Sequence, residues 1–173
     1  MKTNLRFELL EHRRLLALSE FEVVPLPITG DLVYDIEVGD IDGDGIDDFL
    51  VSSNVWATGG TTSWYRSVNG DLEGPFLVFS GWLDTTKLVD IDGDNDLDLF
   101  ASSGNYHALY RNVDGLGTFE RVYQQNFGGT NMDAGDIDGD GDMDVVFSVN
   151  QEETIHTFWL ENLGDDKWES FHI

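Results

Sequence analysis

Three acidic segments with one nine-residue pattern constrain the fold of this chain more than any other feature. They are Asp40–Asp48, Asp90–Asp98 and Asp136–Asp144, and they begin 50 and 46 residues apart. Repeats of that length are typical of arrays of similar supersecondary units, each too small to bury its apolar faces alone. The sequence therefore predicts a row of related units, each carrying one acidic loop.

The composition of the loops indicates that they bind a hard cation. Each loop holds five aspartates, so the three together carry 15 of the 34 acidic residues. Crowded carboxylates repel one another unless a cation lies among them, and oxygen ligands select a hard ion. Carboxylates at positions 1, 3, 5 and 9 and a carbonyl at position 7 can wrap one Ca²⁺, whereas Mg²⁺ demands a tighter octahedron. Position 6, where the backbone must turn sharply, is Gly45, Asn95 and Gly141.

An EF-hand shares the start of this pattern but is not expected here. It needs Glu at position 12 and a helix that leaves the loop. Position 12 is instead Val51, Ala101 and Phe147, and the residues after each loop are of β type. The loops are interpreted as calcium hairpins between two strands. The alternative, acidic turns that merely keep strand edges soluble, does not explain three matching spacings.

Four strands are predicted in each unit. The first strands are expected at 32–38, 85–89 and 131–135, the second strands begin at 49, 99 and 145, the third are 62–68, 107–113 and 157–163, and the fourth are 76–79, 119–124 and 168–173. Four strands in 46–50 residues match a propeller blade. The predicted fold is all-β and β-propeller-type, with three four-stranded blades in a partial or open propeller and a short N-terminal helix. The blades are expected at about 28–80, 81–126 and 127–173.

The Asp loops, together with Ser63–Arg66, Ala108–Asn112 and Phe158–Asn162, resemble the FG-GAP and VCBS repeat family. Integrin-α-like propellers of that family carry a calcium loop between the first two strands of a blade. The resemblance covers about 140 residues. It implies three Ca²⁺ sites, one in each repeat.

The resemblance also implies the ligands of each ion. The carboxylate ligands would be Asp40, Asp42, Asp44 and Asp48, then Asp90, Asp92, Asp94 and Asp98, then Asp136, Asp138, Asp140 and Asp144. The carbonyls of Ile46, Asp96 and Asp142 would complete the sites. Closed propellers of this family have more than three blades, so we expect self-association or further blades from a longer chain.

Residues 1–20 differ in composition from the rest and are predicted to be an export or sorting segment, followed by the blades in 21–173. Leu5, Leu9, His12 and Leu16 have the spacing of a short amphipathic helix. The charged run 11–14 interrupts the apolar stretch that a standard signal peptide needs. Residues 7–17 instead resemble the LEPR-XLL segment of planctomycete surface proteins, although His12 stands where that pattern usually has Pro. The resemblance implies a bacterial extracellular or cell-surface protein, and the alternative is a helix that caps an open edge.

Charge and residue types exclude several functions. A formal charge of -25 argues against direct binding to nucleic acid or anionic membranes. No apolar run is long enough for a membrane span. The absence of cysteine removes thiolate metal sites and cysteine nucleophiles.

No catalytic residue is predicted. The four histidines are interpreted as ordinary strand or edge residues, and the five tryptophans as fillers between blades rather than platforms for sugars. The leading hypothesis is a calcium-binding, non-catalytic propeller module of an exported or surface protein that mediates adhesion or the recognition of a protein or glycan. The alternative is a fragment or accessory domain of a secreted polysaccharide-active enzyme.

Overall fold

The computed structural model describes residues 31–56, 59–104, 106–126, 129, 131–151, 154–165 and 167–173. These ranges contain strands, turns and bends and no helix. The predicted N-terminal helix and the LEPR-XLL-like segment lie outside the described residues.

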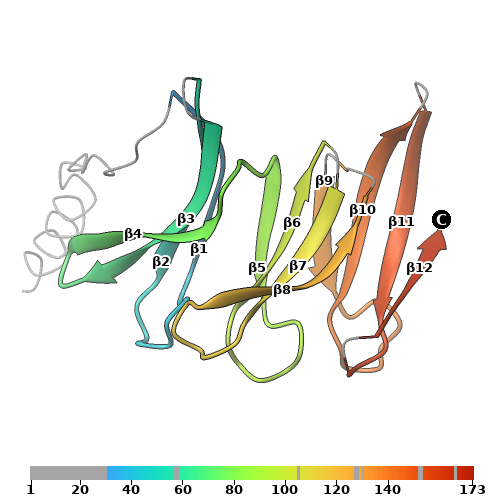
Figure 1. Ribbon diagram of the computed structural model, residues 1–173. Helices are drawn as coiled ribbons and strands as arrows, with labels where there is room; N and C mark the ends of the chain where they lie inside the picture. Colours follow the sequence, from blue (N-terminus) through green and yellow to red (C-terminus); the bar gives the residue numbers. More distant parts are fainter. Residues whose placement is uncertain are drawn as a thin grey trace, which may run out of the picture.

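The described chain forms three four-stranded antiparallel sheets, each built from strands that are consecutive in sequence (Figure 1). The first sheet contains β1 (Leu32–Gly39), β2 (Asp48–Val55), β3 (Gly59–Val68) and β4 (Asp71–Phe79). The second contains β5 (Thr85–Val89), β6 (Asp98–Ser103), β7 (Tyr106–Asn112) and β8 (Phe119–Gln125). The third contains β9 (Asn131–Gly135), β10 (Asp144–Gln151), β11 (Thr154–Asn162) and β12 (Trp168–His172). The all-β, propeller-like prediction of three four-stranded blades is confirmed, and we call the sheets the first, second and third blades.

Local sequence explains the tight hairpin between the third and fourth strands of the first blade. The turn between β3 and β4 is Asn69-Gly70, with φ of 52° and 89°, and it joins the paired residues Val68 and Asp71. Two consecutive positive φ values are what a two-residue hairpin needs, and Asn-Gly tolerates them best. The Asp loops make the wider turns between the first and second strands of each blade.

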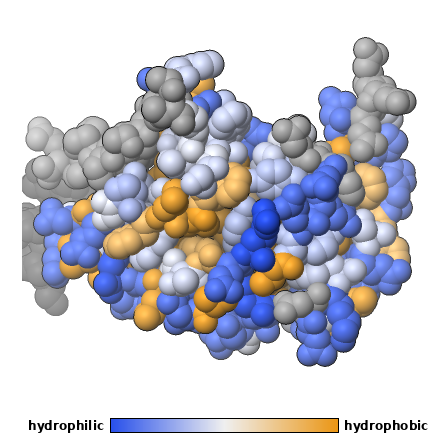
Figure 2. Space-filling view, viewed as in Figure 1, coloured by the Kyte–Doolittle hydropathy of each residue, from blue (hydrophilic) through white to orange (hydrophobic). Residues whose placement is uncertain are grey.

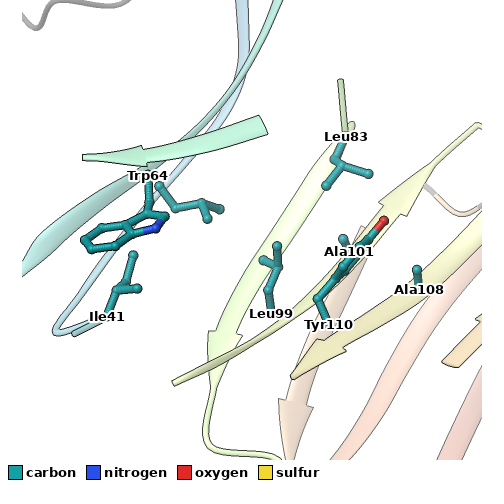
Figure 3. Packing of buried hydrophobic residues seen from close by; sticks show 8 residues of the cluster. Ile41, Trp64, Leu83, Leu99, Ala101, Ala108 and Tyr110 are labelled. Atoms are coloured by element: carbon teal, nitrogen blue, oxygen red, sulfur yellow. The ribbon is translucent and has the colours of Figure 1, made fainter. Parts of the chain in front are cut away.

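The blades stack face to face through alternating residues of their strands. Leu50 and Trp64 of the first blade are buried together with Leu99, Ala101 and Tyr110 of the second (Figure 3). The next residues along β6 and β7 are on the opposite face, where Phe100 and Leu109 belong to a second cluster with Val145, Phe147 and Leu160 of the third blade. Because side chains alternate across a strand, the middle blade supplies an apolar face to both neighbours. The first strands also lie together, with β5 in contact with both β1 and β9.

The outward faces of the first and third blades keep large apolar side chains in solvent. Val38 is 54% exposed on the first blade, while Ile155 is 73% and Ile173 69% exposed on the third. Figure 2 shows apolar side chains gathered over the first blade and its junction with the second, and mostly hydrophilic residues over the third. These surfaces are candidates for further contacts.

Candidate metal centres

The three Asp loops lie at the same end of the stacked blades, at the lower edge in Figure 1. In each loop three carboxylates offer oxygen atoms that all lie within 4.8 Å of one another. The groups are Asp40, Asp42 and Asp48; Asp90, Asp92 and Asp94; and Asp136, Asp138 and Asp140. Calcium binds its oxygen ligands at roughly 2.3–2.6 Å. One ion therefore fits between oxygens that lie within 4.8 Å of one another.

Backbone hydrogen bonds within each loop keep the carboxylates gathered. The position-1 carboxylate accepts N–H groups later in the loop, as when Asp90 accepts from Gly93 at 2.8 Å and from Asn95 at 3.0 Å. The position-5 carboxylate accepts the N–H of position 7, as when Asp94 accepts from Asp96 at 3.0 Å. The residues whose carbonyls are predicted ligands, Ile46, Asp96 and Asp142, are therefore held to the position-5 carboxylate through their own N–H groups.

Position 6 makes the sharp turn that the sequence predicted. Its φ is 86° at Gly45, 74° at Asn95 and 103° at Gly141. A non-glycine residue reaches this region at some cost, and asparagine is among the residues that do so most readily. The middle loop consequently makes the same kind of turn at position 6 as the other two.

The position-9 aspartates have a second, structural role. Asp48, Asp98 and Asp144 are completely buried. In each, one oxygen accepts the N–H of loop position 2 at 3.1 Å, and the other accepts an N–H at the end of the third strand at 2.8 Å. This carboxylate thus ties its loop to the body of its own blade.

Burial makes the negative charge at position 9 costly. Desolvation raises the pKa of Asp98 to about 6, although the two N–H donors, from Asn112 and Ile91, oppose the shift. Desolvation also raises the pKa of Asp48. A cation bound beside these carboxylates would stabilise their charged form.

One position near the end of the third strand differs in charge between the blades. It is the residue just before Ser67, Asn112 or Asn162, whose N–H donates to the position-9 aspartate. In the first blade Arg66 contacts Asp42 through Nε at 2.5 Å and Asp44 through Nη2 at 3.3 Å. In the second blade the Nε atom of Arg111 lies 2.8 Å from Asp92. In the third blade the equivalent residue is Glu161. Its pKa is raised by desolvation and then by a hydrogen bond with Asp138.

Sequence reasoning did not assign these three residues to the loops. The segments that carried the resemblance include Arg66, Arg111 and Glu161, but these residues stand 18, 13 and 17 positions after the last aspartate of their loops. The only available indication was that each stands one residue before Ser67, Asn112 or Asn162 at the end of a predicted third strand. Their contacts with the loops depend on how β3, β7 and β11 pair within the blades.

Asparagines join the first and second loops to the next blade. The side-chain amide of Asn112 donates to the Ile41 carbonyl at 2.9 Å, and that of Asn162 donates to the Ile91 carbonyl at 2.8 Å. Ile41 and Ile91 are position 2 of the first and second loops and are almost fully buried. These two loops are thereby part of the junctions between blades.

Among the histidines and tryptophans, His107 and Trp64 are packed in the interior, whereas Trp56 and Trp82 are exposed. His107 is buried against Phe100 and Phe147, and burial lowers its pKa to about 4. Trp64 is 4% exposed and donates its indole N–H to the Gly117 carbonyl, so it fills the junction between two blades as predicted. Trp56 and Trp82 differ from that prediction because they are 76% and 40% exposed.

A groove runs along the junction of the first and second blades. It is lined by Asp42, Trp64, Arg66, Pro75, Phe76, Leu77, Leu116, Gly117, Thr118 and Phe119. Asp42 is the only carboxylate among these lining residues, and it already contacts Arg66. The groove thus lacks the two opposed carboxylates of a glycoside hydrolase site among its described residues.

The fold and the loops define a β-propeller-type repeat protein. A comparison with protein families agrees, since residues 90–147 match the FG-GAP-like repeat. The matched segment extends from the second Asp loop through the third and into β10. The match covers about a third of the chain, and it supports the FG-GAP resemblance drawn from the Asp loops. No curated protein matches the chain, and the LEPR-XLL-like resemblance stays a prediction.

Proposed function

We propose that this protein is a calcium-binding, non-catalytic repeat module in which each Asp loop holds one Ca²⁺. The observation that carries the proposal is the gathering of three carboxylates, with oxygens within 4.8 Å of one another, in all three loops. A second observation supports it: Oδ1 of Asp40 is buried and has no hydrogen-bond partner. A buried carboxylate oxygen without a partner is costly, and a bound cation would satisfy it.

The proposed ligands are the carboxylates at positions 1, 3, 5 and 9 and the carbonyl at position 7 of each loop. Three ions would change the formal charge from -25 to -19. Their role would be structural, because the position-9 carboxylate ties every loop to its own blade and an asparagine ties the first two loops to the next blade. Calcium would therefore stabilise the hairpins and the stacking of the blades together.

An extracellular or cell-surface role in adhesion or recognition is the second part of the proposal. Repeats of this family occur in extracellular and surface proteins. Among the described residues there is no helix with the length and apolar character to cross a membrane. The alternative, a fragment or accessory domain of a secreted polysaccharide-active enzyme, stays a prediction.

The exposed outward faces support a proposal about partners. Apolar side chains such as Val38, Ile155 and Ile173 lie on blade faces that would be covered by another blade in a longer row. We therefore propose that the protein associates with itself or with further blades. The ligand recognised by such an assembly would be a protein or a glycan.

A calcium titration tests the metal sites. Native mass spectrometry and calorimetry on the full chain should give three Ca²⁺ per molecule, and Asp44→Ala, Asp94→Ala or Asp140→Ala should each remove or weaken one. Asp71→Ala removes an exposed aspartate at the start of β4, outside the loops, and serves as the charge-matched control. A stoichiometry of zero or one would refute the proposal.

Thermal unfolding tests the structural role of the ions. Extracellular-type sites have dissociation constants of about 10⁻⁴–10⁻³ M, so a few millimolar calcium should add roughly 1–2 kcal/mol per site. Circular dichroism melts in excess calcium and in excess chelator, at matched ionic strength, should differ by many degrees. Superimposable curves would contradict a structural role.

A further inference from the structure

One position in the fold carries opposite charges in different blades, although its surroundings repeat. The residue after it donates its backbone N–H to the buried position-9 aspartate at 2.8 Å in every blade, which establishes the equivalence. The position is Arg66 in the first blade, Arg111 in the second and Glu161 in the third. The first two are the arginines that contact their own Asp loops.

The residue that pairs with this position on the fourth strand is the same in all three blades, so the difference in charge is confined to the third-strand residue. Arg66 pairs across the sheet with Glu73, and Arg111 with Glu120. Glu161 pairs with Glu169. The partner is glutamate each time, so the third blade replaces an opposite-charge pair by two like charges. Like charges directly opposite each other on paired strands are destabilising.

The arginines supply a positive charge that the third loop lacks. Each loop contains five aspartates, so the loop and this residue together carry a formal charge of -4 in the first two blades and -6 in the third. The Arg66 guanidinium also occupies oxygens of both Asp42 and Asp44. A metal ion entering there must compete for those oxygens and lie beside a fixed positive charge.

The surroundings of Glu161 favour a cation. Asp138, Glu169 and Asp144, all acidic, act on Glu161, and Asp138 is also its hydrogen-bond partner. Asp138 is one of the three gathered carboxylates of the third loop. Calcium accepts six to eight oxygen ligands, so a further carboxylate next to position 3 can join the set.

We propose that the third loop is the tightest calcium site of this protein, that Glu161 is an additional ligand there, and that Arg66 and Arg111 weaken the first two sites. The inference rests on the proposed function, since it ranks the sites that function requires. It predicts stepwise filling, with the third loop occupied at a calcium concentration at which the others are largely empty. Two formal charges of difference should separate the affinities by about tenfold or more at low ionic strength.

The test is a calcium titration of the full chain by calorimetry and native mass spectrometry at low and at physiological salt. The wild type should show one tight step followed by two weaker ones. Glu161→Gln should weaken the tight step several-fold, and Glu161→Arg should make the third site resemble the others. Glu120→Gln removes the same charge from the second blade and should leave the tight step in place.

The reciprocal variant keeps the proposal testable if Glu161 variants unfold. Arg111→Glu should create a second tight step, because it gives the second loop the charge arrangement of the third. The inference is overturned if the three sites fill together, or if Glu161→Gln and Glu120→Gln give the same titration. Absence of any calcium binding would refute the proposed function itself, which is a distinguishable result.

Discussion

The junction asparagines offer the sharpest test of how the blades are held together. Asn112 is 1% exposed, and its side chain makes two hydrogen bonds. Its amide donates to the Ile41 carbonyl at 2.9 Å in the first blade, and its Oδ1 accepts the N–H of Gly117 at 2.9 Å in the second. Asn112→Ala removes both bonds but keeps the backbone N–H that donates to Asp98.

The expected loss follows from the two partners left behind. The Ile41 carbonyl belongs to a buried residue and the Gly117 N–H is partly buried. An unsatisfied buried group costs about 1–3 kcal/mol, so the variant should lose roughly 2–4 kcal/mol of unfolding free energy. For a chain of this size that corresponds to a decrease in Tm of roughly 5–15 °C.

Ser67 provides the matched control, because it has the same position in the first blade and its N–H donates to Asp48. Ser67→Ala should change stability by less than about 0.5 kcal/mol. Asn162→Ala, which removes the bond to Ile91, should behave like Asn112→Ala. The assay is urea and thermal unfolding by circular dichroism in a fixed excess of calcium. Equal losses for Ser67→Ala and Asn112→Ala would refute the reasoning.

Three other predictions concern the core, a turn and the outward faces. Because burial lowers the pKa of His107 to about 4, its stabilising contribution is present above pH 6.5 and is lost as the pH falls towards 4, by up to about 3 kcal/mol. His107→Leu should remove that part of the pH dependence in urea melts between pH 7 and 4.5, and parallel curves would contradict it. Gly117→Ala should cost about 2–4 kcal/mol, because φ is 87° and the new Cβ would lie 2.3 Å from the Trp64 ring. Gly70→Ala has nearly the same φ, 89°, with no atom within 4 Å, so it should cost about 1–2 kcal/mol. Light scattering at micromolar concentration should show self-association through the outward faces, whereas a monodisperse monomer that binds no hydrophobic dye would argue against it.

The repeat, the strands and the calcium-type loops could be predicted from the sequence because they depend on local patterns. The Asp pattern, its spacing and the apolar runs around it are encoded within a few residues of each other. The predicted first strands at 85–89 and 131–135 coincide with β5 and β9. Position 6 of each loop was also predictable, since only a few residue types accept the positive φ found at Gly45, Asn95 and Gly141.

Tertiary structure alone decided which distant residues meet the loops. Asn112 reaches Ile41 across 71 residues, and Asn162 reaches Ile91 across the same separation. Arg66 and Arg111 contact their loops, while Glu161 contacts Asp138, only because β3, β7 and β11 end beside them. Such contacts depend on strand register and on the stacking of whole sheets, which position side chains through the sum of many weak packing interactions. No local pattern of residues contains that information, so the contacts of Arg66, Arg111 and Glu161 with the loops become visible only in the folded structure.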